Sequence, residues 1–405
     1  MADILNKLNS ANYVTVKVTD DSITNGNNLL AAYANAKTKT PNGAALSASN
    51  RLAIILPPAI YDLGTQSLVL DTQYIDIIGS TNNKYNHFIK NNSDTGTILQ
   101  TVGNIKLQNL NIENTNATGY DYYPNTNLSF THLENIFFSG LKPTRPNIIY
   151  NGKYISCSSE RDKLFGPGGT VLYGYFLDCH GKNYSFGGSP TTFSWSFIPT
   201  NNMVLSGEFI DCSAGTHSFG IGCFSFGFLD PSFHPVIHGN FINCKGDRAC
   251  FSNFDYPSTN WTILSGTFTN CTMGAGSFNA RSIYGNFTDC SAGPGSFGIR
   301  KVAAQSRLSS EMKVNMTNCS AGSDSFKSSA EGILPVGNIT GNFTNCHAES
   351  NSFNNMENSY LYYCSARDNS FKVTNSKIIN CITSGYDTEA YRSSKQNSVS
   401  NLIYL

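Results

Sequence analysis

The sequence predicts an all-β fold of the β-solenoid type, in which the chain winds through a stack of short coils. Three observations predict it: a repeat that dominates residues 150–385, repeat units as short as 17 residues, and a charged fraction of only 13%. Units of this length are too short for two helices each, and an average soluble domain has roughly a quarter of its residues charged. We therefore expect stacked strands and turns with little charged helical surface.

The repeat is built on cysteine and phenylalanine. Eight cysteines are each followed, seven residues later, by a phenylalanine. The cysteines are Cys179, Cys212, Cys244, Cys271, Cys290, Cys319, Cys346 and Cys364. The phenylalanines are Phe186, Phe219, Phe251, Phe278, Phe297, Phe326, Phe353 and Phe371. The consensus is G-x-F-x-(D/N)-C-x5-S-F, and degenerate copies at Cys157 and Cys381 flank the series, as the ends of a stacked array require.

The repeat unit favours strands over helices. It is rich in Gly, Asn, Ser and Thr, which are poor helix formers. Short extended segments alternate with Gly-containing turns. If each unit is one coil, equivalent residues stack ~4.8 Å apart, so that each Phe lies above a Phe and each Cys above a Cys.

We interpret the cysteines as a ladder of small buried side chains that fills a narrow interior. Metal or redox chemistry is the alternative, but no Cys-x-x-Cys pair or zinc-type spacing occurs. We therefore expect no metal and no cofactor. Cys223 and Cys250 lie outside the register of the ladder.

Residues 13–112 show a related but less regular pattern. Residues 28–37 are predicted to form a short amphipathic helix, after turns at 20–22 and at Asn25-Gly26. Short strands are predicted at residues 13–18, 51–58 (stopped by its prolines), 60–63, 68–70, 75–79, 97–100 and 105–112.

This amino-terminal region resembles the first coils of the pectin-lyase-like superfamily, which includes many phage tail spikes. The matching residues are Leu29 to Ala36, Ile54 to Leu63, and Asp76 to Gly79. The resemblance implies a right-handed parallel β-helix with a short amino-terminal capping helix. It implies little about chemistry, because the superfamily contains lyases, hydrolases, spikes and adhesins.

The domain organisation follows from these patterns. We expect an amino-terminal segment and capping helix at 1–45, irregular first coils at 46–150, regular coils with lateral loop insertions at 151–385, and a carboxy-terminal tail at 386–405.

Three consecutive coils carry aromatic insertions, at residues 188–205, 221–238 and 252–265. Insertions at one site on adjacent coils stack on one side of a solenoid, so we expect a lateral aromatic patch. It is interpreted as a secondary core, a subunit interface or a sugar-binding platform. The interface is weighted above the platform, which favours a homo-oligomer and above all a homotrimer. The candidate binding residues are Trp195, Phe197, Phe224, Phe226, Phe228, Tyr256 and Trp261.

Catalytic residues are not identified by any motif, so the chain is not assigned as an enzyme or as a non-enzyme. Glycoside hydrolysis uses two carboxylates about 5–9.5 Å apart. The weak candidates are Asp230, Asp247, Asp255, Glu160 and Asp162, all of them also ordinary turn formers.

The balance of charged residues argues against some classes of partner. With 27 basic and 27 acidic residues the formal net charge is zero, which argues against nucleic acid as a partner. No apolar run is long enough to span a membrane, and the first residues lack the layout of a secretory signal.

We therefore expect a structural or receptor-binding β-helix, of spike, fibre or decoration type, made in a host cytoplasm and located on the surface of a phage virion. Its expected partners are other virion proteins, with carbohydrate binding to a surface polysaccharide as a further expectation. One alternative is a polysaccharide-degrading tail-spike enzyme, either a glycoside hydrolase or a lyase. Another is a bacterial fibre or adhesin located outside the cell or on its surface.

Overall fold

The protein was analysed as a computed structural model, in which the chain forms two compact units, Met1–Lys182 and Asn183–Leu405. The structure describes residues 11–125, 128, 130–145, 148–166, 170–187, 204–220, 236–252, 263–301, 311–330, 338–371, 373–383, 398–400 and 403–404. Within those residues, no helix is long and apolar enough to cross a membrane. Each unit is described by itself.

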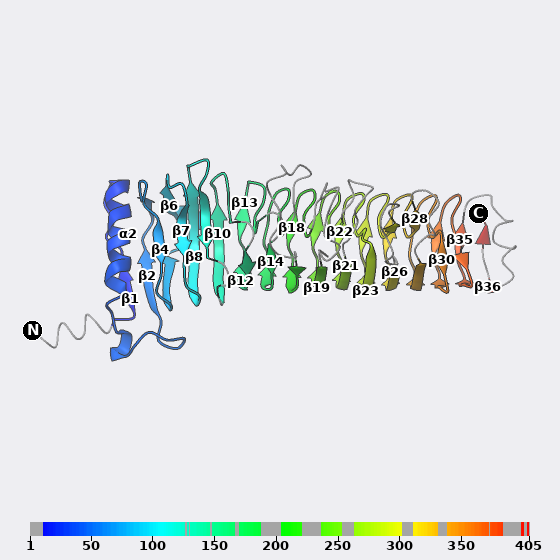
Figure 1. Cartoon of the computed structure of the whole chain (residues 1–405), viewed down its shortest axis with the longest axis horizontal. Coiled ribbons are helices and arrows are strands. Elements are labelled where there is room, and N and C mark those ends of the chain that lie inside the picture. Colours follow the sequence, from blue (N-terminus) through cyan, green and yellow to red (C-terminus); the bar gives the residue numbers. More distant parts are fainter. Residues whose placement is uncertain are drawn as a thin grey trace, which may run out of the picture. The chain divides into compact units, whose positions relative to one another are not determined.

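The helix α2 (Ser22–Ala36) of the first unit lies across the end of the first coils (Figure 1). It starts six residues before the predicted helix, because the side chain of Asp21 caps it by accepting a hydrogen bond from the backbone N–H of Thr24 at 2.8 Å. The predicted turn at Asn25-Gly26 is therefore wrong. Gly26 lies inside the helix, where a Cβ would collide with the carbonyl oxygen of Asp62. The glycine thus allows helix and coil to approach closely.

The remaining elements of the first unit are short strands and two 3-10 turns. They are β1 (Tyr13–Thr15), η1 (Pro41–Gly43), β2 (Leu52–Leu56), β3 (Ala59–Asp62), β4 (Leu68–Leu70), β5 (Ile75–Gly79), η2 (Lys84–Asn86), β6 (His87–Asn91), β7 (Gly96–Gln100), β8 (Ile105–Asn114), β9 (Tyr120–Pro124), β10 (Thr131–Phe138), β11 (Ile149–Tyr150), β12 (Gly152–Ile155), β13 (Ser158–Ser159), β14 (Val171–Leu172) and β15 (Tyr175–Leu177). Successive coils pair in parallel, as where Ile54 of β2 aligns with Ile77 of β5 in the buried core. The strands predicted at 68–70 and 75–79 have the predicted bounds.

The second unit repeats one coil design. Its strands are β16 (Val204–Leu205), β17 (Glu208–Ile210), β18 (Ser213–Ala214), β19 (Val236–Ile242), β20 (Lys245–Gly246), β21 (Ile263–Thr269), β22 (Thr272–Met273), β23 (Ser282–Thr288), β24 (Ser291–Ala292), β25 (Ile299–Lys301), β26 (Glu311–Thr317), β27 (Ser320–Ala321), β28 (Ser328–Ala330), β29 (Asn338–Thr344), β30 (Met356–Glu357), β31 (Tyr360–Tyr362), β32 (Ser365–Ala366), β33 (Val373–Thr374), β34 (Lys377–Ile379), β35 (Ile382–Thr383), β36 (Ser398–Ser400) and β37 (Ile403–Tyr404). β21, β23, β26 and β29 align in parallel without a register shift over seven residues each. The predicted all-β parallel β-helix fold is confirmed, and its right-handedness stays a prediction.

Each regular coil turns through three residues in the left-handed region of backbone space. In the coil of Cys290 they are Asp289 at φ 54°, Gly295 at φ 68° and Phe297 at φ 51°. Asn, Asp and Gly adopt this region more readily than other residues, which explains the (D/N) position of the consensus. The phenylalanine has no such preference, so its backbone conformation is held by the packing of its ring.

The phenylalanine rings form a continuous stack inside the second unit. From Phe186 to Phe371, successive rings lie 4.7–5.2 Å apart between centroids with interplanar angles of 1–17°. A second column contains Phe268 and Phe287, 4.6 Å apart. The two columns meet edge to face, as between Phe268 and Phe278 at 84°. Every ring named here is buried, so the coil interior is filled by aromatic contacts.

The serine before each phenylalanine links one coil to the next. The hydroxyl of Ser296 accepts a hydrogen bond from the backbone N–H of Ser277 at 3.1 Å, and Ser325 does the same for Ser296 at 3.2 Å. These serines are buried, so the hydroxyl satisfies a backbone donor that has no access to water. Cys250 stands in the serine column, where its own backbone N–H donates to Ser277 Oγ at 3.2 Å.

The cysteine thiols also bond across coils. Cys290 Sγ donates to the backbone oxygen of Phe268 at 3.3 Å, and Cys364 Sγ donates to that of Phe343 at 3.3 Å. These two thiols therefore meet carbonyl oxygens of the aromatic column in the preceding coil, whereas Cys346 Sγ donates to the backbone oxygen of Met316 at 3.7 Å. Small size and a weak S–H donor suit this position.

Candidate functional site

Most of the predicted binding residues lie outside the described part of the chain. These are Trp195, Phe197, Phe224, Phe226, Phe228, Tyr256 and Trp261, together with the carboxylate candidates Asp230 and Asp255. Of the other carboxylates, Asp247 is an exposed turn residue of the second unit, and Glu160 and Asp162 lie in an exposed turn of the first unit. Asp162 lines a pocket of the first unit.

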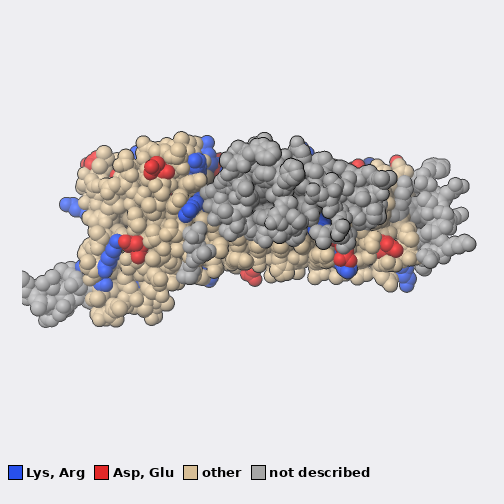
Figure 2. Space-filling model, viewed as in Figure 1, with Lys and Arg blue, Asp and Glu red and all other residues tan. Residues whose placement is uncertain are grey.

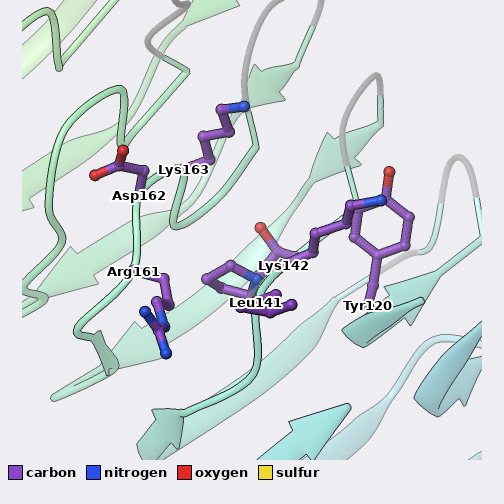
Figure 3. Close-up of a pocket in the computed structure, with 8 residues that line it drawn as sticks. Tyr120, Leu141, Lys142, Arg161, Asp162 and Lys163 are labelled. Carbon is purple, nitrogen blue, oxygen red and sulfur yellow. The ribbon is translucent and has the colours of Figure 1, made fainter. Parts of the chain in front are cut away.

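The pocket lies in the first unit, where parts of three successive coils stack (Figure 3). The middle segment, residues 141–144, is bonded to β9 because Asp121 N–H donates to the backbone oxygen of Lys142 at 2.9 Å. The following turn is tied to it because Gly166 N–H donates to Thr144 Oγ at 3.0 Å. The pocket has a volume of about 390 Å³, the size range of small-molecule sites. Its lining residues are Tyr120, Leu141, Lys142, Pro143, Thr144, Arg161, Asp162 and Lys163.

The pocket lining holds three cations, Lys142, Arg161 and Lys163, against one carboxylate, Asp162. Figure 3 shows the Asp162 carboxylate directed away from Lys142 and Tyr120. On the face of the molecule that Figure 2 shows, most described atoms belong to uncharged residues. The pocket therefore concentrates positive charge in a chain of zero net charge.

The position of Lys142 is fixed by two contacts. Its ammonium lies 5.3 Å from the centroid of the Tyr120 ring and donates a hydrogen bond to the backbone oxygen of Thr118 at 3.2 Å. A similar pair follows on the same coil edge, where the Arg145 guanidinium lies 4.2 Å from the Tyr123 ring. The two tyrosine rings are themselves 5.7 Å apart. Tyrosines and cations thus form one contiguous surface beside the pocket.

Asp121, next to Tyr120 in the chain, is fully buried. Its Oδ1 accepts a hydrogen bond from the backbone N–H of Asn114 at 2.6 Å, and its Oδ2 accepts one from Gly140 at 2.9 Å. Burial raises the pKa of Asp121 well above its ordinary value, against the opposing effect of the two hydrogen bonds. Both oxygens are occupied, so this carboxyl group holds the coil together and is not presented to a ligand.

The turn that carries Arg161 is one residue longer than in the regular coils. Phe165 follows Cys157 by eight positions instead of seven, yet its ring occupies the aromatic interior, 4.9 Å from Tyr154 and 5.2 Å from Phe176. The extra residue hides this phenylalanine from a search at fixed spacing. For the same reason the turn at residues 159–166 is not recognised as the equivalent of the turns in the regular coils. A sequence search that allowed one inserted residue would find both the phenylalanine and the turn.

The two carboxylates of this turn differ in their contacts. Glu160 pairs with Lys182 at 3.2 Å, an exposed ion pair. Asp162 makes no ion pair or side-chain hydrogen bond with the residues that the structure describes. Asp162 is therefore the carboxylate of the pocket, and Lys182 neutralises Glu160.

The cysteines of the described residues are free, buried thiols. Hydrogen bonds to the neighbouring thiols of Cys244 and Cys290, and then burial, raise the pKa of Cys271 well above its ordinary value. Burial likewise raises the pKa of Cys364. Cys271 and Cys364 are thus held in the protonated, unreactive form. Among the described residues, no group of three or more His, Cys, Asp or Glu side chains is arranged to hold a metal ion.

Comparison with known proteins does not identify a family for the chain. No protein-family model and no curated protein matches the chain. Among solved structures, the chain is similar to the A-module of the mannuronan C-5 epimerase AlgE6 from Azotobacter vinelandii, at 9% identity and a TM-score of 0.33. The match covers 96% of this chain and 98% of that one. The fold assignment rests on the parallel strand register described above and not on this likeness.

Proposed function

We propose that the protein is a structural, receptor-binding β-helix of a phage virion surface. The observation that carries the proposal is the continuity of the interior ladders. In the second unit each coil supplies the next with a stacked ring and a serine hydroxyl, as Phe278 and Phe297 do with Ser277 and Ser296. Such a stack is stabilised by its own neighbouring coils. It leaves the turns free to carry binding residues, which is the division of labour that a surface-exposed receptor-binding element needs.

The direct test uses purified protein and antibodies raised against it. We expect the antibodies to label the surface of particles of the phage that encodes the chain. We also expect the labelled protein to bind cells of that phage's host and to block adsorption of the particles. Labelling of bacterial cells alone, in the absence of phage, would contradict the proposal in favour of a bacterial adhesin.

A homotrimer is part of the same proposal, and it rests on the aromatic insertions of the sequence. Native mass spectrometry of the purified chain is expected to give three times the monomer mass of 44.1 kDa. A double substitution, Trp195→Ala with Trp261→Ala, is expected to weaken the trimer, because large aromatic anchors dominate interfaces. A monomer at micromolar concentration would reject this part of the proposal.

One observation favours a second function, a polysaccharide-degrading enzyme. Asp162 is a carboxylate without a described partner that lines a pocket of the size of a sugar unit. If the chain is a depolymerase acting there, purified protein shortens host polysaccharide and Asp162→Asn abolishes the shortening while leaving binding intact. Glu160→Gln is the matched control from the same turn. Binding without shortening by the wild-type protein leaves the receptor-binding function standing.

A further inference from the structure

We propose that the pocket beside Tyr120 binds the anionic group, a carboxylate or a phosphate, of a sugar-sized ligand. Arg161 and Lys163 are its direct partners. This inference deepens the proposed receptor-binding function, and the choice of a sugar as the body of the ligand rests on that function. The anion itself follows from the charges and contacts of the pocket.

The pocket cations Arg161 and Lys163 differ from other lysines of the first unit in their ion pairing. Within the first unit, other lysines are neutralised by nearby carboxylates, as in Lys90–Asp62 at 3.2 Å and Lys106–Glu134 at 2.8 Å. Neither Arg161 nor Lys163 makes an ion pair or side-chain hydrogen bond with the residues that the structure describes. The lining holds three cations and one carboxylate, so its charge is positive and a bound anion is attracted to it.

Three carboxylates lie in or near the turn that carries Arg161 and Lys163. Asp162 is directed away from Lys142 in Figure 3. The carboxyl group of Asp121 is sealed by two backbone N–H donors, and burial raises its pKa. Glu160 is engaged by Lys182. Asp121 is therefore buried and Glu160 is paired, and Asp162 alone does not balance the three cations of the lining, which leaves positive charge available to a ligand.

The rest of the pocket lining combines apolar surface with a cation that is already held in position. Pro143 is buried and Leu141 is 54% exposed, so the pocket has apolar surface between its charged sides. Lys142 is held over the Tyr120 ring and by Thr118, so it is positioned before any ligand arrives. A preorganised cation loses less side-chain entropy on binding. The combination of apolar surface with three cationic side chains and a volume of about 390 Å³ fits one sugar ring with one anionic substituent.

The test is isothermal titration of the full-length protein with four probes: galacturonate, galactose 6-phosphate, galactose and inorganic phosphate. We expect at least one sugar anion to bind at least about tenfold more tightly than galactose, the effect of a charge-assisted hydrogen bond. Comparison of the two sugar anions tells which anionic group the pocket prefers. Binding is expected to weaken at ~1 M salt, where the Debye length falls to about 3 Å.

The variants Arg161→Ala and Lys163→Ala are each expected to weaken the binding of the sugar anion about tenfold or more. Lys245→Ala, at an exposed lysine of β20 in the second unit, is the matched control and leaves binding unchanged. Near-ultraviolet circular dichroism shows that each variant is folded. If folded wild-type protein binds no sugar anion at millimolar concentration, or if Arg161→Ala and Lys163→Ala bind as wild type, the proposal is wrong. If inorganic phosphate binds as tightly as the sugar anions, the pocket is an adventitious anion site only, and the sugar ligand is rejected.

Binding to host cells separates this inference from the proposed function. If wild-type protein binds cells and the pocket variants bind them equally well, the pocket ligand is rejected while receptor binding stands. If wild-type protein binds the sugar anion but no cell or virion, the receptor function is rejected and the anion site stands.

Discussion

The side-chain amide of Asn318 donates a hydrogen bond to the Asp289 carboxylate of the preceding coil at 2.8 Å. Asn345 in turn donates to Asn318 at 3.0 Å. The same direction holds earlier in the unit, where Asn270 donates to Asn243 at 2.9 Å. A carboxylate accepts but has no hydrogen to donate, so Asp289 starts one ladder and interrupts the sequence of amides after Asn270.

Replacing Asp289 with asparagine is expected to join the two ladders into one. The new amide donates to Asn270 and still accepts from Asn318, which adds one hydrogen bond and removes a charge from between two amides. We expect the free energy of unfolding to rise by about 0.5–1.5 kcal/mol, measured by chemical denaturation. Asn318→Asp is the matched control, and it is expected to destabilise the unit because two carboxylates then stack on adjacent coils. A gain in stability for Asn318→Asp would contradict the directional ladder.

Removing a buried serine hydroxyl is expected to lower the free energy of unfolding. Ser296→Ala leaves the backbone N–H of Ser277 without its acceptor in the buried interior, which costs about 1–3 kcal/mol of unfolding free energy. Ser296→Cys is the control, because Cys250 occupies the equivalent position in a natural coil. We expect the cysteine variant to lose less stability than the alanine variant, as measured by denaturant unfolding. Equal losses would show that the ladder bond is unimportant.

Stability is expected to fall at alkaline pH because of the buried thiols. Burial raises the pKa of Cys250 to about 12, whereas an exposed thiol in the unfolded chain titrates near 8.5. The folded state thus keeps a proton that the unfolded state releases, so the contribution of the neutral thiol is complete below about pH 8.5 and is lost as pH rises toward 12. Between these two pKa values, one such thiol lowers the free energy of unfolding by about 1.4 kcal/mol per pH unit.

The measurement compares wild type with Cys250→Ser between pH 7 and 10. Serine is the residue of this column in the other coils, and it does not titrate in this range. We expect the free energy of unfolding to fall more steeply with rising pH in wild type than in the variant. Above about pH 8.5 the two slopes should differ by about 1.4 kcal/mol per pH unit. Identical slopes for the two proteins would rule out a raised pKa at Cys250.

The capping helix is expected to depend on the hydroxyl of Tyr33. This oxygen accepts hydrogen bonds from the backbone N–H groups of Asp71 at 2.9 Å and Thr72 at 3.1 Å, and burial raises the pKa of Tyr33 to about 12. Tyr33→Phe is expected to cost about 1–3 kcal/mol locally and to speed amide hydrogen exchange at those two residues. Lys37→Ala breaks a partly exposed ion pair with Asp71, worth about 1 kcal/mol or less, and removes an ammonium that lies 5.1 Å from the centroid of the Tyr33 ring, but it leaves the Tyr33 hydroxyl in place. Unchanged exchange in Tyr33→Phe would refute the capping role.

Much of the fold could be predicted from local patterns, and the exceptions have physical causes. The strands at 68–70 and 75–79 are flanked by turn residues and have the predicted bounds. Asn25-Gly26 reads locally as a turn, but Asp21 caps a helix that runs through it, and the close approach to Asp62 makes the glycine necessary. Phe165 escaped a fixed-spacing search because its coil has one extra residue, while the interior accepts its ring all the same.

The candidate site was predicted only in part. Asp162 was named as a carboxylate candidate, but Lys142 and Arg161 were not, although all three line one pocket. The two cations belong to different coils, and their meeting depends on how the turns of unequal length stack. Local sequence patterns do not contain that information.

The repeat, its coil length and the residue types at its corners are determined by the sequence alone, because a side chain's preference for a turn or for the interior is a local property. Which side chains of different coils meet is decided by tertiary structure. The serine hydroxyl that accepts from the preceding coil, the direction of the amide ladder at Asp289, and the presence of Lys142 and Arg161 in the lining of one pocket all depend on stacking. Stacking converts a one-dimensional repeat into contacts between residues that are distant in the chain, and both the stability of the coils and the proposed ligand site arise from those contacts.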